Sequence, residues 1–181
     1  MELWDVYDVN RKRTGKRIVR GRDRLSAGEY HLVVIILVFS SDGRLLIQKR
    51  TDTKAGWPSM WDVSCGGAVV AGENSAEGAE RELFEEIGIK HSFLGVRPHF
   101  SFAHKLGFAD CYIIERDVDP EKLPLQASEV SAVKYATLDE ILAMIDEGVF
   151  IPYYESLVRL MFDMRAGYGS HRNAKKQDKD N

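Results

Sequence analysis

The chain has 181 residues, of which 44% are hydrophobic and 29% charged, a balance typical of one soluble globular domain with its own core. A formal net charge of −3 argues against a general attraction to nucleic acid or anionic membranes, and the longest apolar run, 32–39, is too short to span a bilayer. Cys65 and Cys111 make no disulfide framework, and the N-terminus lacks the basic start and apolar stretch of a signal peptide. We therefore expect a cytoplasmic protein, with neither nucleic-acid polymers nor membranes among its partners.

The first elements of the chain are predicted to form a hairpin. Residues 3–10 alternate apolar and polar side chains, as a half-buried strand does, and a turn-like basic stretch separates them from Ile18 and Val19. Basic residues crowd this region: Arg11, Lys12, Arg13, Lys16, Arg17, Arg20, Arg22 and Arg24. Two interpretations are open, a solvated hairpin and loop or an arm that attracts an anionic substrate.

The next segments are predicted to be strands. Residues 30–40 form a continuous β-branched and aliphatic run, which predicts a strand covered on both faces. An Asp-Gly turn follows, so residues 44–50 are expected to pair with this strand in antiparallel orientation. A loop is predicted over 51–61, which Gly and Pro interrupt, and residues 62–70 are consistent with strand, turn and strand.

The clearest predicted helix lies between Ser75, expected as its N-cap, and Gly88, expected to end it. Glu77 in the first turn suits the positive end of the helix dipole. Apolar residues recur at spacings of three and four and predict one buried stripe: Ala76, Ala79, Leu83 and Ile87.

The second half of the chain is predicted to add strands over 91–104 and 108–117. One further helix is expected to begin near Thr137, and another to lie within 151–166. This mixture of strands and a few helices predicts an α/β or α+β fold.

No internal repeat or linker divides the sequence, so a single domain is expected over residues 1–168. Within it, residues 1–27 would form the hairpin and the basic loop. The remaining residues, 169–181, are polar and are expected to form a disordered tail.

Acidic residues are concentrated on one face of the clearest helix. Glu82, Glu85 and Glu86 are spaced i, i+3 and i+4, so they share a face, which the periodicity predicts to lie roughly opposite the apolar stripe. Two interpretations are open, a solvated surface or a site for a hard divalent cation such as Mg²⁺. Gly78 lies one turn before Glu82, where glycine costs about 1 kcal/mol relative to alanine, and a close approach of ligand or backbone would explain it.

The acidic helix belongs to a longer pattern that resembles the Nudix box. From Gly67 to Ile89 the sequence matches every defined position of GX5EX7REUXEEXGU, and the strand-rich flanks are also similar to Nudix proteins. The resemblance implies an α/β fold, a Nudix-type α/β/α sandwich with a central mixed sheet. It also implies hydrolysis of a diphosphate linked to another moiety.

The resemblance implies roles for residues of the box. It assigns the metal ligands to Glu82, Glu85, Glu86 and the carbonyl oxygen of Gly67. The cofactor is expected to be Mg²⁺, with Mn²⁺ as an alternative, because metals that bridge phosphate oxygens neutralise charge and activate water. Arg81 is expected to orient the glutamates, Glu73 above all.

The general base is assigned less narrowly. Glu85 is one candidate, and Glu129 is another because many Nudix enzymes place a base on a loop after the box; as a lone residue, Glu129 is equally well interpreted as a surface acid. Weaker candidates for substrate contacts are Trp61, Lys49, Arg50 and His31. An aromatic ring could stack on a base and a cation could meet phosphate, whereas loop packing, solvated strand ends and a structural histidine are the alternatives.

Residues 3–140 resemble, more narrowly, the Nudix branch closest to type 1 isopentenyl-diphosphate isomerase. Cys65 aligns with the catalytic cysteine of that isomerase, and His31 aligns with one of its metal-binding histidines. Gly67 and Arg24 stand where the isomerase has further histidines, whereas the acids that the isomerase loses from the box are kept. Hydrolysis is therefore favoured, and Cys65 is interpreted as a buried core residue.

The sequence thus predicts metal-dependent hydrolysis of a nucleoside diphosphate derivative or a nucleoside di- or triphosphate. Two alternatives stay open: an isopentenyl-diphosphate isomerase-like activity, and a non-catalytic nucleotide-binding or regulatory Nudix domain. Domains of the second kind usually lose metal acids, and this chain keeps all of them. The expected partner is a small-molecule diphosphate, and a homodimer is left open.

Overall fold

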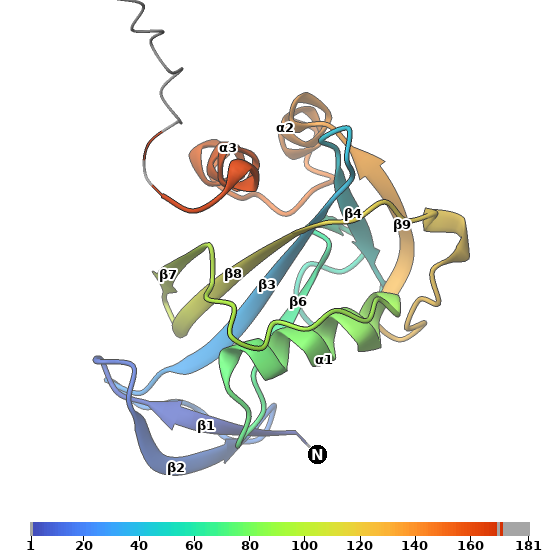
Figure 1. Ribbon diagram of the computed structural model, residues 1–181. Coiled ribbons are helices and arrows are strands. Elements are labelled where there is room, and N and C mark those ends of the chain that lie inside the picture. Colours follow the sequence, from blue (N-terminus) through green and yellow to red (C-terminus); the bar gives the residue numbers. More distant parts are fainter. Residues whose placement is uncertain (1, 170, 172–181) are drawn as a thin grey trace, which may run out of the picture.

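Helices cover both faces of a mixed β-sheet in the computed structural model, which describes residues 2–169 and 171 (Figure 1). Helix α1 (Ser75–Ile87) lies on one face, and α2 (Leu138–Asp146) and α3 (Glu155–Asp163) lie on the other. The predicted α/β/α sandwich is therefore confirmed. Helix α2 begins where it was expected, since Thr137 is its N-cap and exchanges hydrogen bonds with Glu140 in a capping box.

Seven strands of the described chain form the central sheet. They are β3 (His31–Phe39), β4 (Leu45–Arg50), β5 (Trp61–Asp62), β6 (Cys65–Ala68), β7 (Phe100–His104), β8 (Gly107–Glu115) and β9 (Val130–Ala136). Their order is β5-β4-β3-β8-β7, with β6 also paired to β3 and β9 to β4. β3 and β8 run parallel, and the other pairs are antiparallel. The sequence did not predict β9, because Ser131, Ala132 and Lys134 interrupt its strand-forming residues and leave no clear alternation.

Strand β3 lies at the centre of the fold and divides its core in two. Val34 and Ile36 pack toward α1, and Leu37 and Phe39 pack toward α2 and α3. All four side chains are buried, because successive residues of a strand point to opposite faces and both faces are covered by helices. The prediction of a strand buried on both sides is confirmed.

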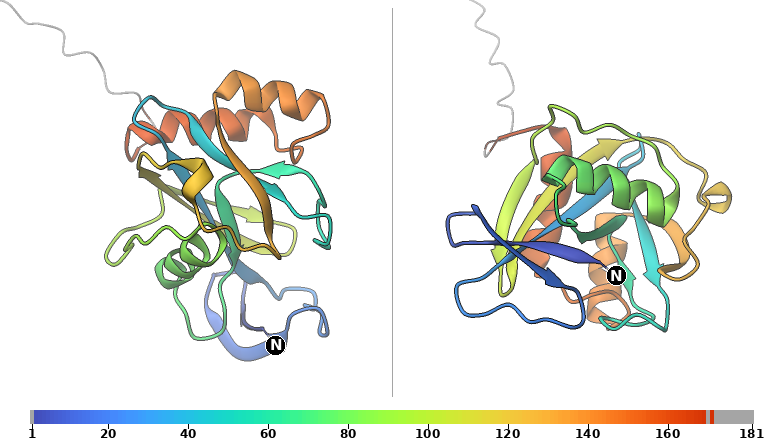
Figure 2. Two further views of the ribbon diagram at one scale, coloured as in Figure 1. Left: turned by 90° about the vertical axis from the view of Figure 1, so that its right-hand side faces the viewer. Right: turned by 90° about the horizontal axis from the view of Figure 1, so that it is seen from below.

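A two-stranded hairpin, β1 (Leu3–Tyr7) and β2 (Arg13–Val19), forms a separate sheet below the start of α1 (Figures 1 and 2). Its strands pair in antiparallel orientation, as predicted. Much of its positive charge is matched locally, since Arg17 pairs with Asp5 and Arg20 pairs with Glu2.

Two local predictions are wrong. The N-cap of α1 is Asn74, whose side chain accepts the Glu77 N–H at 3.0 Å, while Ser75 Oγ donates instead to Asp110 at 2.6 Å. The strand expected over 91–104 exists only at Phe100–His104, because the chain before it turns at Gly95 (φ 75°) and passes through a proline.

The remaining elements are two short 3₁₀ helices, η1 (Pro120–Lys122) and η2 (Met164–Ala166). Of the tail expected to be disordered over 169–181, only Gly169 and His171 are described, so that expectation lies largely outside the described residues. None of the described helices is long and apolar enough to cross a membrane.

Candidate active site

The three glutamates of α1 that are predicted to bind metal differ sharply in exposure. Glu86 is only 5% exposed, and the side chains of Glu82 and Glu85 are 13% and 49% exposed. The prediction that this face lies opposite the apolar stripe is wrong for Glu86, which is buried beside Leu83 and Ile87. The reason is helix geometry: at about 100° per residue, Glu86 lies roughly 20° around the helix axis from Ala79, so it falls beside the apolar stripe and not opposite it.

Two glycines allow the helix to approach β6 closely. A Cβ atom on Gly67 would collide with the carboxylate of Glu82, so glycine leaves the space that this carboxylate fills. A Cβ atom on Gly78 would lie 2.9 Å from Val69 Cγ2, so close packing of the chain explains the glycine in the middle of the helix.

The buried carboxylates carry an electrostatic cost. Burial, followed by repulsion from Glu82, raises the pKa of Glu86 to about 7, although Gln48 Nε2 donates to Glu86 at 2.9 Å. Burial also raises the pKa of Glu82, against the opposing positive charge of Arg81. Crowded negative charge in a poorly solvated place is stabilised by a cation.

Arg81 joins the acids into one network. Its Nε and Nη2 donate to the carboxylate of Glu73 at 2.9 and 3.2 Å, and its Nη1 donates to Glu82 at 2.8 Å and to Glu85 at 3.1 Å. Nη2 also donates to the Ala68 carbonyl at 2.9 Å, which ties the helix to the end of β6. This single side chain therefore fixes the relative positions of three carboxylates.

The donor set fits a hard divalent cation. Within residues 2–169 and 171, no group of three or more His, Cys, Asp and Glu side chains is arranged as a complete metal site. Mg²⁺, however, is usually held by one or two carboxylates together with water and substrate phosphates. The neighbouring carboxylates of Glu82 and Glu86, beside a glycine that leaves them room, match that requirement.

Each candidate base has a basic partner. Glu129, just before β9, forms an ion pair with Lys54, and Glu85 is held by Arg81. Lys54 is largely buried, and its pKa is lowered by burial and by Arg50, while Glu86 and Glu82 oppose that shift. Lys54 therefore lies close enough to Glu86 and Glu82 to feel their charge. The sequence analysis did not identify it, because a lone lysine in a loop carries no periodic signal.

The four weaker candidates for substrate contacts lie next to other parts of the protein, and their role toward substrate stays a prediction. The Arg50 guanidinium binds the Gly56 carbonyl at 3.0 Å and Asp62 at 3.4 Å. The Trp61 ring lies under the Lys134 ammonium, at 4.8 Å, and Trp61 pairs with Lys49 across β4 and β5. His31 is buried and stacks on Trp4, with 4.5 Å between the ring centroids.

Cys65 is completely buried in the core between β3 and α1. Burial, and then the charges of Glu86, Glu82 and Asp62, raise the pKa of its thiol well above the ordinary value. A thiol held protonated is a poor nucleophile, which supports the interpretation of Cys65 as a small core residue and argues against the isomerase alternative.

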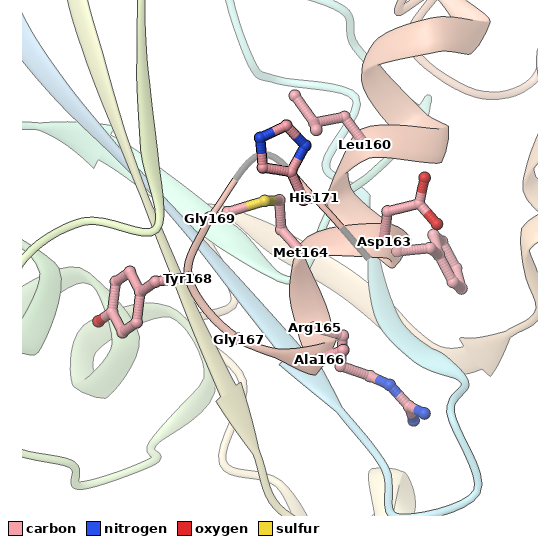
Figure 3. Close-up of a pocket in the computed structure, with 10 residues that line it drawn as sticks. Leu160, Asp163, Met164, Arg165, Ala166, Gly167, Tyr168, Gly169 and His171 are labelled. Carbon is pink, nitrogen blue, oxygen red and sulfur yellow. The ribbon is translucent and has the colours of Figure 1, made fainter. Parts of the chain in front are cut away.

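A separate cavity of about 500 Å³ lies beside the C-terminal end of α3 (Figure 3). Its lining runs from Leu160 to His171 and includes Met164, Arg165 and Tyr168. None of the acids of α1 lines it, so this cavity is distinct from the candidate active site.

Comparisons with known proteins identify the family of the chain. The sequence profile of the NUDIX domain matches residues 29–154. "Uncharacterized Nudix hydrolase lmo0368" of Listeria monocytogenes is 44% identical over 154 residues, which cover 85% of this chain and 90% of that protein. "Nudix hydrolase 3" of Arabidopsis thaliana is 32% identical over 167 residues, which cover 84% of this chain but 22% of that longer protein.

The fold is also similar to solved structures. DR0079 from Deinococcus radiodurans superposes with a TM-score of 0.73 at 27% identity, covering 88% of this chain and 98% of that one. The MutT protein of Methanosarcina mazei superposes with a TM-score of 0.58 at 22% identity, covering 76% and 95%, and shares the fold.

Proposed function

Because the chain belongs to the Nudix hydrolase family, we propose that it hydrolyses a nucleoside diphosphate derivative or a nucleoside di- or triphosphate with Mg²⁺ as cofactor. Nudix hydrolases in general cleave pyrophosphate linkages of small molecules and need divalent metal ions. One observation carries the proposal: the carboxylates of Glu82, beside Gly67, and Glu86, near the Gly66 N–H, repel each other and have raised pKa values. The two free, buried cysteines support a cytoplasmic site of action.

In this proposal the residues that hold Mg²⁺ are Glu82, Glu85, Glu86 and the Gly67 carbonyl. The bound metal would neutralise phosphate charge and lower the pKa of a water molecule. Arg81 keeps Glu82 and Glu85 in a fixed orientation through the contacts described above. Glu73 in turn accepts hydrogen bonds from Nε and Nη2 of Arg81, so its role is to hold Arg81.

The attacking water must lose a proton as the phosphorus–oxygen bond of the leaving group breaks. Glu129 is one acceptor, and its pairing with Lys54 suggests how it becomes available: a substrate phosphate would compete for the Lys54 ammonium. Glu85 is the other acceptor, and it has the most exposed carboxylate of the three on α1.

The nucleoside part of the proposal has separate support. Trp57 is 50% exposed in the loop that also carries Lys54, and its backbone adopts a left-handed conformation, φ 51°. An exposed ring held at a strained loop position is suited to stacking on a base. The same loop would thus supply both a cation for the phosphates and a surface for the base.

A substrate panel tests the proposal directly. The protein is incubated with Mg²⁺ and with nucleoside di- and triphosphates, nucleoside diphosphate derivatives and isoprenoid diphosphates, and the products are separated by chromatography. We expect release of phosphate, pyrophosphate or a nucleoside monophosphate from the nucleotides, and loss of the activity with EDTA. Allylic isomerisation, or tight nucleotide binding without turnover, would overturn the proposal. The pH–rate profiles of Glu85→Gln and Glu129→Gln would then identify the base.

A further inference from the structure

The N-terminal hairpin contacts the loop that joins β6 to α1 at three successive residues. The Ala71 N–H donates to the Leu3 carbonyl at 2.8 Å, and the Gly72 N–H donates to Asp5 Oδ2 at 2.8 Å. The third contact runs from the Arg13 guanidinium to the carbonyl oxygen of residue 73. The NUDIX profile match begins at residue 29, so the hairpin that makes these contacts lies outside it.

Asp5 is the centre of this contact. It is 8% exposed, and Arg17 Nε donates to its Oδ1 at 3.0 Å while Arg13 Nε lies 3.4 Å from its Oδ2. Burial alone raises the pKa of Asp5, but the Gly72 N–H, Arg17 and Arg13 together lower it, so the charged form is held in place. Because Gly72 has φ 98°, its N–H faces Asp5 only while the loop keeps a conformation that favours glycine.

The same loop carries Glu73, which begins the network of the candidate metal site. The Val70 N–H donates to Glu73 Oε2 at 3.3 Å, so a backbone amide of the loop also holds the Glu73 side chain. Glu73 then binds Arg81, and Arg81 binds Glu82 and Glu85. A displacement of the loop would therefore move Glu73 and Arg81, and with Arg81 the two proposed metal ligands that it binds.

The far end of the hairpin is fixed independently. Arg11, in the turn between β1 and β2, donates to the buried carboxylate of Asp110 on β8 at 2.6 Å. Ser75 Oγ, at the start of α1, donates to the same Asp110 oxygen at 2.6 Å. The hairpin is thus held both at its tip and along β1, and it can act as a rigid support for the loop.

We propose that Asp5 is a positioning residue for the metal site: it holds the loop before α1 so that Glu73 orients Arg81 and, through it, Glu82 and Glu85. This inference rests on the proposed function, because it assumes that these acids hold the metal. It assigns the hairpin a part in the catalytic unit, and it predicts that removing the Asp5 contact to the loop weakens metal binding without altering a ligand.

Mn²⁺ binding to the full chain, followed by electron paramagnetic resonance without substrate, tests the inference. Asp5→Ala is expected to raise the Kd for Mn²⁺ about tenfold, at the lower end of the roughly 10–100-fold loss typical of changes behind the ligands. It should also speed hydrogen exchange of the Gly72 amide. Asp5→Asn keeps an acceptor for that amide and should restore most of the affinity. The control is Asp8→Ala, whose side chain binds only amides of the hairpin turn.

Each outcome decides the question. Wild-type affinity in folded Asp5→Ala, or equal losses in Asp5→Ala and Asp8→Ala, would overturn the inference and leave the proposed function standing. A wild-type protein that neither binds Mn²⁺ nor hydrolyses the panel would overturn the proposed function, and the inference with it. If Asp5→Ala does not fold, Arg13→Gln removes the contact to the loop from an exposed side chain and should raise the Kd in the same direction.

Discussion

Helices α1 and α2 start and end by the same rules but use their acids differently. Asn74 and Thr137 each close a capping box, and left-handed glycines, Gly88 and Gly148, follow the two helices. In α1 a glutamate, Glu86, is buried with a raised pKa, whereas the acids of α2 are exposed. The comparison teaches that α1 keeps charges that lower its own stability, as expected where function and stability compete.

The largest expected effect separates the two helices by activity. Glu82→Gln and Glu86→Gln should each lower kcat by roughly 10²-fold or more, because a lost metal ligand removes several kcal/mol of transition-state stabilisation. Asp146→Asn, on the exposed side of α2, is the matched control and should leave kcat unchanged. Steady-state kinetics at saturating Mg²⁺, with far-UV circular dichroism to verify folding, measures both.

Near-wild-type turnover in both glutamate variants would show that the acids of α1 matter no more for catalysis than those of α2. It would refute the assignment of Glu82 and Glu86 as metal ligands. A loss that excess Mg²⁺ fully restores would instead indicate weakened binding at an otherwise competent site.

The next expected effect is a gain: the Glu86 substitution that lowers kcat should raise the stability of the metal-free protein. The pKa of Glu86 is about 7 in the folded protein against an ordinary 4.5, so its contribution to stability is present below about pH 4.5 and is lost as the pH rises through 7. Without metal, Glu86→Gln should therefore raise the free energy of unfolding at pH 8 by roughly 3 kcal/mol relative to its effect at pH 4.5. Urea denaturation in EDTA at the two pH values measures this.

Glu140→Gln on α2 provides the contrast. The N–H and hydroxyl of Thr137 lower the pKa of Glu140, so its contribution to stability is present above its ordinary pKa and is lost on acidification. This substitution should lower stability at pH 8 or leave it unchanged. A similar gain in stability for both variants would show that a general relief of negative charge, and not the burial of Glu86, is responsible.

The same comparison explains how far the sequence could predict the molecule. Periodicity and turn chemistry were sufficient for β3, for the extent of α1 to within one residue and for the start of α2, because these depend on local pattern and on burial of one stripe. The box made Glu82 and Glu86 candidates for metal ligands, and that assignment stays a prediction. The box did not give how deeply their carboxylates are buried, because that depends on how closely β6 packs against α1.

Contacts between distant segments set the other limit. Ser75 and Asn74 are both good N-caps, and the choice between them follows from Asp110, which engages the Ser75 hydroxyl from another strand. Lys54 meets Glu129 across 75 positions of sequence, and Asp5 meets Gly72 across 67. Such pairs are fixed by the tertiary fold and leave no periodic signal.

The smallest expected effect is a difference in stability loss when the glycines that follow the two helices are replaced by alanine. Both have φ near 70°, so alanine at either position costs roughly 1–2 kcal/mol in the left-handed region. At Gly148 nothing lies within 4 Å of an added Cβ atom, but at Gly88 it would collide with the Pro124 ring. Gly88→Ala should therefore lower the free energy of unfolding by about 1 kcal/mol more than Gly148→Ala, as overpacking adds to the backbone strain.

The collision at Gly88 also has a functional consequence, because Pro124 begins the segment that leads to Glu129. The Gln126 N–H donates to the Glu86 carbonyl at 3.0 Å, so this segment closes over the end of α1 and carries the candidate base toward the acids. Displacing Pro124 should therefore lower kcat in Gly88→Ala, while Gly148→Ala keeps wild-type turnover per folded molecule. Equal stability losses and equal turnover in the two variants would mean that the end of α1 is as open as the end of α2.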